Sequence, residues 1–264
     1  MKKLIFLLCL VAAACAVVPI TGRKQFIAIP ADQMLSLSAD SYSQVLRETK
    51  LSTNQRYVTS VRNVGNSLTA AVKKYMQQNN MESSIAGYQW QYNVLASEEM
   101  NAWCMPGGQI AFYEGIMPVC QDDNGIAVVM GHEIAHAVAR HGNERMSQQL
   151  VIQMGGVALA EALSTQKETT QELALLAFGV GSTLGVVLPY SRTHELEADE
   201  LGLYFMAMAG YDPRTAPAFW ERMIAKGRSG TPEFLSTHPD PANRITDLQK
   251  NMPKAMEYYQ ANKK

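Results

Sequence analysis

Residues His132-Glu-Ile-Ala-His136 place two histidines four positions apart. On a helix that advances roughly 100° per residue, two such residues lie about 40° apart, so both imidazoles can reach one metal ion. Glu133 follows the first histidine, where its carboxylate can take a proton from a water molecule at that metal. The pattern is common by chance, so the metal chemistry that it suggests needs support from the rest of the sequence.

The flanking residues predict that this pentapeptide lies on a helix. Gly125 precedes an apolar run at residues 126–130, and Gly142 follows the motif. His141 would then lie about 180° round the helix from His132. We therefore expect His141 to point away from the metal, unless the helix ends sharply before it.

A later helical segment offers a carboxylate as the third metal ligand. Glu195 and Asp199 are four residues apart and share a helix face, whereas Glu197 lies on another face. Glu195 could complete a His-His-Glu site, and Asp199 could accept a hydrogen bond from a ligating histidine. An ordinary charged helix surface is the alternative. The small residues Ala198 and Gly202 favour close packing against another helix instead.

Composition limits the classes of protein to which this chain can belong. Its 264 residues are 47% hydrophobic, which is enough for a packed core, and 23 basic residues nearly balance 24 acidic ones. Because no run of Lys or Arg and no stripe of aromatic and basic residues occurs, we expect no nucleic-acid partner. Without internal repeats, residues 31–264 are expected to form one catalytic domain.

The first residues have the order of an export signal. Lys2 and Lys3 precede an apolar stretch at residues 4–11, three alanines follow at residues 12–14, and Cys15 comes next. Small residues directly before a cysteine resemble the processing site of bacterial lipoproteins.

We therefore expect residues 1–14 to be removed as a signal peptide, Cys15 to carry lipid, and residues 15–30 to form a lipid-tethered arm. The chain would then be a membrane-anchored lipoprotein on the periplasmic side of the bacterial cell envelope. Two alternatives remain, which are ordinary secretion with cleavage after Ala14 or Ala16, and a retained membrane anchor.

Alternating residues predict two strands, at residues 88–94 and 109–113. The turn Pro106-Gly-Gly108 sets off the second strand. Cys104 and Cys120 lie on either side of it. In an oxidising compartment they could form a disulfide, or they could be two small buried side chains.

Helical spacing of apolar residues predicts a helical region over residues 31–78. Two apolar stretches, at residues 150–163 and 173–188, predict a helical hairpin, and Pro189 is expected to end the second stretch. Since the second stretch is shorter than the roughly 20 residues that span a bilayer, we expect the hairpin to be buried or to lie on a membrane surface. A membrane span is the alternative.

Four blocks of the sequence, taken together, carry a family resemblance. They are Asn101-Ala-Trp-Cys-Met-Pro-Gly-Gly-Gln-Ile110, Gly131-His-Glu-Ile-Ala-His-Ala-Val-Ala-Arg-His141, Pro189-Tyr-Ser-Arg-Thr-His-Glu-Leu-Glu-Ala-Asp199 and Leu235-Ser-Thr-His-Pro-Asp-Pro-Ala-Asn-Arg-Ile245. In these blocks the chain resembles the M48 family of zinc metallopeptidases, particularly its bacterial Oma1-like lipoproteins. The blocks follow the order of the family and cover roughly residues 45–250.

The resemblance implies an α+β, mainly helical metallopeptidase domain of the gluzincin (HExxH) type with a small β-sheet. It implies one Zn²⁺ ion per chain, with His132, His136 and Glu195 as the ligands. It also implies that Glu133 is the catalytic base and that Asp199 supports a ligand by a hydrogen bond.

The resemblance further implies residues around the metal. The edge strand of the sheet, here residues 109–113, would lie above the active-site helix, where an extended polypeptide could pair with it. His238 is our second candidate catalytic residue, as a hydrogen-bond donor to the developing oxyanion. Arg244 is expected to anchor its segment through an ion pair with an acidic group near the site.

These features predict a zinc-dependent endopeptidase that hydrolyses unfolded or membrane-associated envelope proteins in protein quality control. Its expected partners are polypeptides bound in extended form and the membrane, reached through the lipid anchor. The alternative is a catalytically idle, metal-stabilised scaffold or chaperone-like binder. Glu133 argues against that alternative, because a scaffold has no need of a carboxylate at this position.

Overall fold

The computed structural model describes residues 15–227, 232–238 and 243–263. The predicted signal peptide, residues 1–14, lies outside the described residues, as do residues 239–242 of the fourth sequence block. Within the described residues the chain is mainly helical, with one three-stranded and one two-stranded sheet. The expected fold class, a mainly helical α+β domain with a small sheet, is confirmed.

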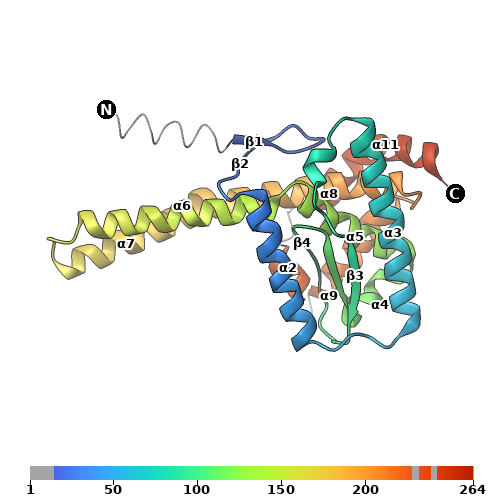
Figure 1. Ribbon diagram of the computed structural model, residues 1–264, viewed down its shortest axis with the longest axis horizontal. Helices are drawn as coiled ribbons and strands as arrows, with labels where there is room; N and C mark the ends of the chain where they lie inside the picture. The colour runs from blue at the N-terminus through green and yellow to red at the C-terminus, as the bar shows by residue number, and fades with distance from the viewer. Residues whose placement is uncertain (1–14, 228–231, 239–242, 264) are drawn as a thin grey trace.

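Two helices cross at the centre of the body, α5 (Asp123–Val138) and α8 (Leu188–Met208) (Figure 1). They approach closely because glycine lies on both sides of the contact. A methyl group added at Gly131 would lie 2.7 Å from the carbonyl oxygen of Gly202. Ala198 is also fully buried, so the prediction of close helix packing at the small residues is confirmed.

The three-stranded sheet packs beside this crossing. Its strands are β3 (Gln91–Leu95), β4 (Ala102–Met105) and β5 (Gln109–Tyr113), in the order β3-β5-β4. Strand β5 has the predicted bounds, but it is the central strand, so its expected place at the edge is wrong. The edge strand that packs on α5 is β4. The sequence did not reveal β4, because its four residues are all apolar or small and show no alternation.

The predicted helical region near the N-terminus consists of two helices, α2 (Ala31–Glu48) and α3 (Gln55–Gln78). Between them Leu51 forms an isolated bridge to Leu95 of β3. The side chain of Asn54 then caps α3 by accepting a hydrogen bond from a backbone N–H.

The predicted hairpin is formed by α6 (His141–Ala162) and α7 (Glu168–Ser182), which project together from the body (Figure 1). Pro189 does not end the second helix. A π-helical segment, Thr183–Val187, continues directly into α8. Pro189 is the second residue of α8, directly after this π-helical segment.

Cys104 and Cys120 are free thiols, so the disulfide alternative is wrong.

The N-terminal arm and the C-terminal elements complete the structure. The remaining elements are β1 (Cys15–Val17), β2 (Lys24–Phe26), α4 (Met117–Cys120), α9 (Thr215–Gly227), α10 (Glu233–Thr237), α11 (Arg244–Asn262) and the 3₁₀ turns η1 (Glu82–Ile85) and η2 (Glu114–Ile116).

Candidate metal centre

Four buried side chains meet where α5 crosses α8. They are His132 and His136 from α5, Glu195 from α8 and His238 directly after α10. The Nε2 atoms of the two α5 histidines are 3.1 Å apart. Glu195 lies 3.3 Å from the first of these nitrogens and 3.4 Å from the second. The structure therefore brings together the three residues that were predicted as ligands.

The spacing of these donor atoms fits a tetrahedral zinc ion. Donors about 2.05 Å from a tetrahedral ion lie about 3.3 Å from one another. His238 Nδ1 has the same spacing, 3.3 Å from both His132 Nε2 and Glu195. Imidazole nitrogen and carboxylate oxygen are also the ligand atoms that zinc accepts. In both chemistry and distance the four residues could hold this metal.

The place of His238 differs from the role that the sequence suggested. We expected an oxyanion donor beside the metal, and the structure puts the ring among the possible ligands. There it takes the fourth position, which a catalytic zinc site leaves for water or substrate. Its Nε2 lies 3.4 Å from Glu133 Oε1. No sequence spacing links His238 to the motif on α5. The resemblance implied that it lies beside the metal, and the structure adds that its ring is among the possible ligands.

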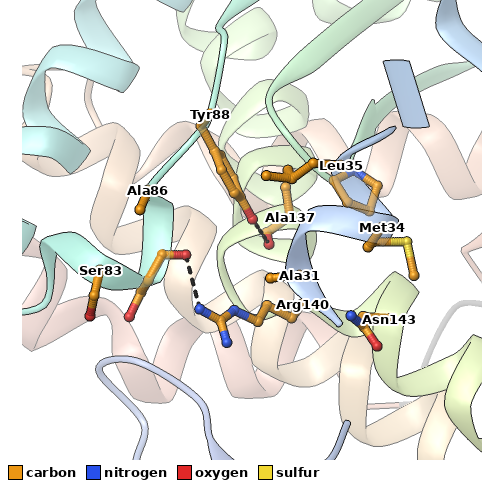
Figure 2. A pocket seen from close by; sticks show the side chains of 11 residues that line it. Ala31, Met34, Leu35, Ser83, Ala86, Tyr88, Ala137, Arg140 and Asn143 are labelled. Atoms are coloured by element: carbon orange, nitrogen blue, oxygen red, sulfur yellow. Dashed lines mark hydrogen bonds between the residues drawn. The ribbon is translucent and has the colours of Figure 1, made fainter. Parts of the chain in front are cut away.

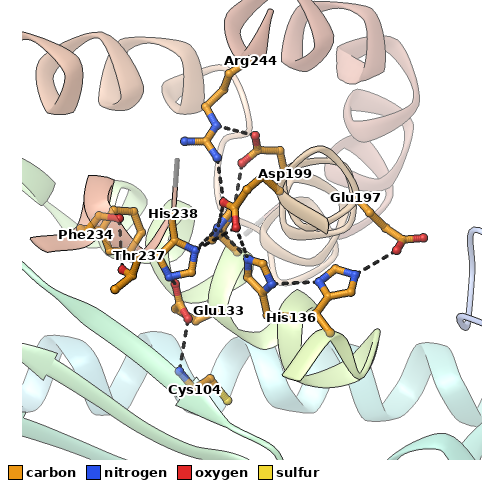
Figure 3. A network of polar contacts seen from close by, with 12 residues as sticks. Cys104, Glu133, His136, Glu197, Asp199, Phe234, Thr237, His238 and Arg244 are labelled. Atoms are coloured by element: carbon orange, nitrogen blue, oxygen red, sulfur yellow. Dashed lines mark hydrogen bonds and ion pairs between the residues drawn. The ribbon is translucent and has the colours of Figure 1, made fainter. Parts of the chain in front are cut away.

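Glu133 has the surroundings of a proton acceptor. Its Oε2 accepts a hydrogen bond of 3.2 Å from the backbone N–H of Cys104 in β4 (Figure 3). Its Oε1 is buried and makes no hydrogen bond to any described residue. Burial raises the pKa of Glu133 above the usual carboxyl value. A carboxylate with a raised pKa and an oxygen free of hydrogen bonds is suited to taking up a proton.

The second ring nitrogen of His132 is tied to a carboxylate. Its Nδ1 donates a hydrogen bond of 2.9 Å to Asp199. Arg244 holds that carboxylate at 2.6 Å through Nε and reaches Glu195 at 3.1 Å through Nη2 (Figure 3). The hydrogen bond expected for Asp199 and the ion pair expected for Arg244 are both present. They fix the orientation of the His132 ring.

His141 does not point away from the cluster, because the helix that carries the motif ends earlier than expected. Helix α5 stops at Val138, and Arg140 has a left-handed backbone with φ of 59°. The chain therefore turns, and His141 Nδ1 comes within 2.8 Å of His136 Nδ1. His141 remains outside the group of four possible ligands and contacts one of them from behind.

Glu197 lies on a different face of α8 from Glu195, as expected, and that face carries a second ionic cluster. Glu197 accepts from His141 Nε2 at 2.9 Å and from Arg23 Nε at 2.8 Å. Arg23 also binds Glu144 at 2.7 Å, and His194 donates to Glu144 at 2.8 Å. The sequence indicated none of these contacts, because residues 50 to 174 positions apart share no local pattern.

A separate pocket of about 120 Å³ lies between α2, the turn after β4 and the C-terminal end of α5 (Figure 2). At its wall the Tyr88 hydroxyl donates a 2.7 Å hydrogen bond to the carbonyl of Ala137, and Arg140 donates to Ser84. None of the four possible metal ligands lines this pocket, so it is a different place from the candidate centre.

The chain matches a known protein family over most of its length. Residues 66–252 match peptidase family M48. A mitochondrial metalloendopeptidase OMA1 of Schizosaccharomyces pombe is 31% identical over 240 residues, which are 90% of this chain and 66% of that protein. The corresponding protein of Saccharomyces cerevisiae is 30% identical over 253 residues, 92% of this chain and 70% of the relative.

A bacterial relative is the beta-barrel assembly-enhancing protease of Escherichia coli strain K12. It is 29% identical over 160 residues, which are 59% of this chain and 33% of that protein. The chain thus spans between about a third and 70% of the length of these relatives.

The second ionic cluster predicts how stability changes in acid. Burial alone would raise the pKa of Glu144, but hydrogen bonds from His194 and Arg23 lower it from 4.5 to about 2. A lowered folded-state pKa stabilises the fold above pH 4.5, and this contribution is lost as the pH falls toward 2. Because solvent screens the partly exposed pair, the contribution stays below the roughly 3 kcal/mol to which the full shift corresponds.

We expect Glu144→Gln to lower the free energy of unfolding at neutral pH and to flatten its decline between pH 4.5 and 2. Urea unfolding at several pH values measures both effects. The matched control is Glu161→Gln at an exposed position on the same helix, which should follow the wild-type curve. If the free energy of unfolding of Glu144→Gln fell as steeply between pH 4.5 and 2 as that of wild type, the decline would not come from Glu144.

Proposed function

We propose that this chain, which belongs to peptidase family M48, is a zinc-dependent endopeptidase. In this proposal His132, His136 and Glu195 hold the metal and Glu133 is the catalytic base. The observation that carries it is the cluster of buried donors 3.1 to 3.4 Å apart, beside Oε1 of Glu133, which makes no hydrogen bond to a described residue.

Each residue has a task that follows from its contacts. Zinc, when bound, supplies Lewis-acid activation of water and of the substrate carbonyl. Glu133 takes the proton of the attacking water and passes it to the leaving amine, which its raised pKa favours. Asp199 and Arg244 hold His132 in orientation. His238, once it leaves its place among the donors, can donate to the carbonyl oxygen as negative charge develops.

The free edge of β4 is the proposed binding site for an extended substrate. Cys104 pairs with Ile110 of β5 in register, yet its N–H points to Glu133 and not into the ladder. The outer edge of β4 therefore faces the candidate centre. Pairing with such an edge reads the backbone of a peptide and needs little sequence specificity. We propose unfolded or extended segments as the substrates.

We also propose that the chain acts at a membrane of the bacterial envelope, in protein quality control, with lipid on Cys15. Relatives named as a mitochondrial metalloendopeptidase and a beta-barrel assembly-enhancing protease favour this setting. The hairpin supports it independently, because its apolar side chains are exposed. By length and composition, Glu168–Met208 could even cross a membrane. The exposed large apolar side chains of the hairpin are Met146, Leu150, Val151, Met154, Val157, Leu173, Leu176 and Val180.

Peptide hydrolysis is tested by Glu133→Gln. The amide cannot act as a base, so cleavage of unfolded casein should fall about 100- to 10,000-fold. Zinc content, measured on the same sample, should stay at the wild-type level because Glu133 is not a ligand. Equal cleavage by both proteins would show that Glu133 is not the catalytic base. Wild-type protein that binds zinc and cleaves no unfolded substrate would favour the scaffold alternative.

Membrane contact by the hairpin is tested on protein that lacks the proposed lipid anchor on Cys15. The Cys15→Ala variant should still float with vesicles of phosphatidylethanolamine and phosphatidylglycerol. Glutamine at Val157, Leu173 and Leu176 should abolish flotation, because it removes exposed apolar area. Leu37→Gln, at an exposed position on α2, is the control and should change nothing. Undiminished flotation of the triple variant would contradict the role of the hairpin.

A further inference from the structure

We infer that Arg23, in the N-terminal arm, is a positioning residue for His136, and that it acts through Glu197 and His141. The inference rests on the proposed metal site, because it concerns the orientation of one proposed ligand. It assigns to the arm, expected only as a tether, a part in building the centre.

The first step of this connection sets the protonation of two rings. His136 Nε2 faces the other donors, so its Nδ1 faces away from them, 2.8 Å from His141 Nδ1. One of these two nitrogens must donate and the other accept. His141 Nε2 already lies 2.9 Å from Glu197, and a carboxylate only accepts. In a neutral His141 the proton is therefore on Nε2, and His136 Nδ1–H donates. This leaves the lone pair of His136 Nε2 for the metal.

The second step fixes the carboxylate on which the rings depend. Glu197 is buried, and a buried carboxylate is stable only when it is paired. Arg23 Nε donates to its Oε2 at 2.8 Å, and the Thr21 hydroxyl donates to its Oε1. Both donors come from the N-terminal arm. The described side chains that hold Glu197 opposite His141 are thus supplied by a segment far away in the sequence.

The third step fixes Arg23 itself. Its two terminal nitrogens bind the two oxygens of Glu144, at 3.2 and 2.7 Å, while Nε binds Glu197. A planar guanidinium that pairs with two carboxylates has little freedom to rotate, which a lysine could not reproduce. Glu144 lies on α6, so Arg23 joins the arm, α6 and α8 at one point.

The arrangement on the other side of the cluster supports this interpretation. There His132 Nδ1 donates directly to Asp199, and Arg244 holds Asp199. Each proposed histidine ligand is thus connected to a carboxylate that is paired with an arginine. His132 contacts its carboxylate directly, whereas His136 is connected to Glu197 through the ring of His141. Arg244 also touches Glu195, a proposed ligand, whereas Arg23 acts only through other residues.

The test measures metal affinity and not activity. Zinc and cobalt binding by wild type, Arg23→Gln and Glu197→Gln are compared by chelator competition, with the visible spectrum of bound Co²⁺ as a report on ligand geometry. Thermal unfolding of the metal-free proteins shows whether each variant is folded. Glu197→Gln leaves Arg23 paired with Glu144 and keeps the arm attached, so it serves if Arg23→Gln does not fold. Lys24→Ala, an exposed neighbour in the same arm, is the control.

We expect Arg23→Gln and Glu197→Gln to weaken zinc binding about 10- to 100-fold and to alter the cobalt spectrum, as for other residues that orient ligands. Arg23→Lys should recover only part of the affinity, and Lys24→Ala should match wild type. Folded variants with wild-type affinity and spectrum would overturn the inference and leave the proposed function intact. Wild-type protein that binds neither metal would overturn the proposed function, and the inference with it.

Discussion

The close contact between α5 and α8 is the constraint on which the rest of the structure depends. Glycine on both helices lets the backbones come close together. A methyl group added at Gly202 would lie 2.7 Å from the backbone nitrogen of His132. At this separation the carboxylate of Glu195 from α8 lies 3.3 Å from the imidazole of His132 in α5. The crossing therefore supplies three of the four possible ligands, and β4 and His238 add the groups that contact Glu133.

The crossing also buries several charged groups that need compensation. Isolated charges are costly in a protein interior, and pairs are tolerated when their hydrogen bonds are satisfied. Arg244 compensates Asp199 and Glu195 on one side, and Arg23 compensates Glu197 and Glu144 on the other. Each arginine comes from a different end of the chain. The centre is thus completed only when both ends have folded onto the helical pair.

Local periodicity explains how much of the site could be predicted. Helix geometry brought His132 and His136 to one face and put Glu195 and Asp199 on a different face from Glu197. The family resemblance then implied Glu195 as the ligand. Helix geometry failed for His141, because a single left-handed residue at position 140 ended the helix and no sequence rule marks such a residue. Strand β4 was missed because four residues carry too little pattern. The contacts of Arg23 depend on tertiary packing, which periodicity does not describe.

The proposed centre requires that α5 and α8 together hold one zinc ion. Elemental analysis of purified, dialysed protein tests it most directly, with Glu195→Ala compared with wild type and with Glu200→Ala from the same helix. We predict one zinc per chain in wild type and in Glu200→Ala, and loss of the metal in folded Glu195→Ala. Equal zinc in all three proteins, or a folded wild-type protein that retains none when zinc is supplied, would rule out a zinc site at the crossing of α5 and α8.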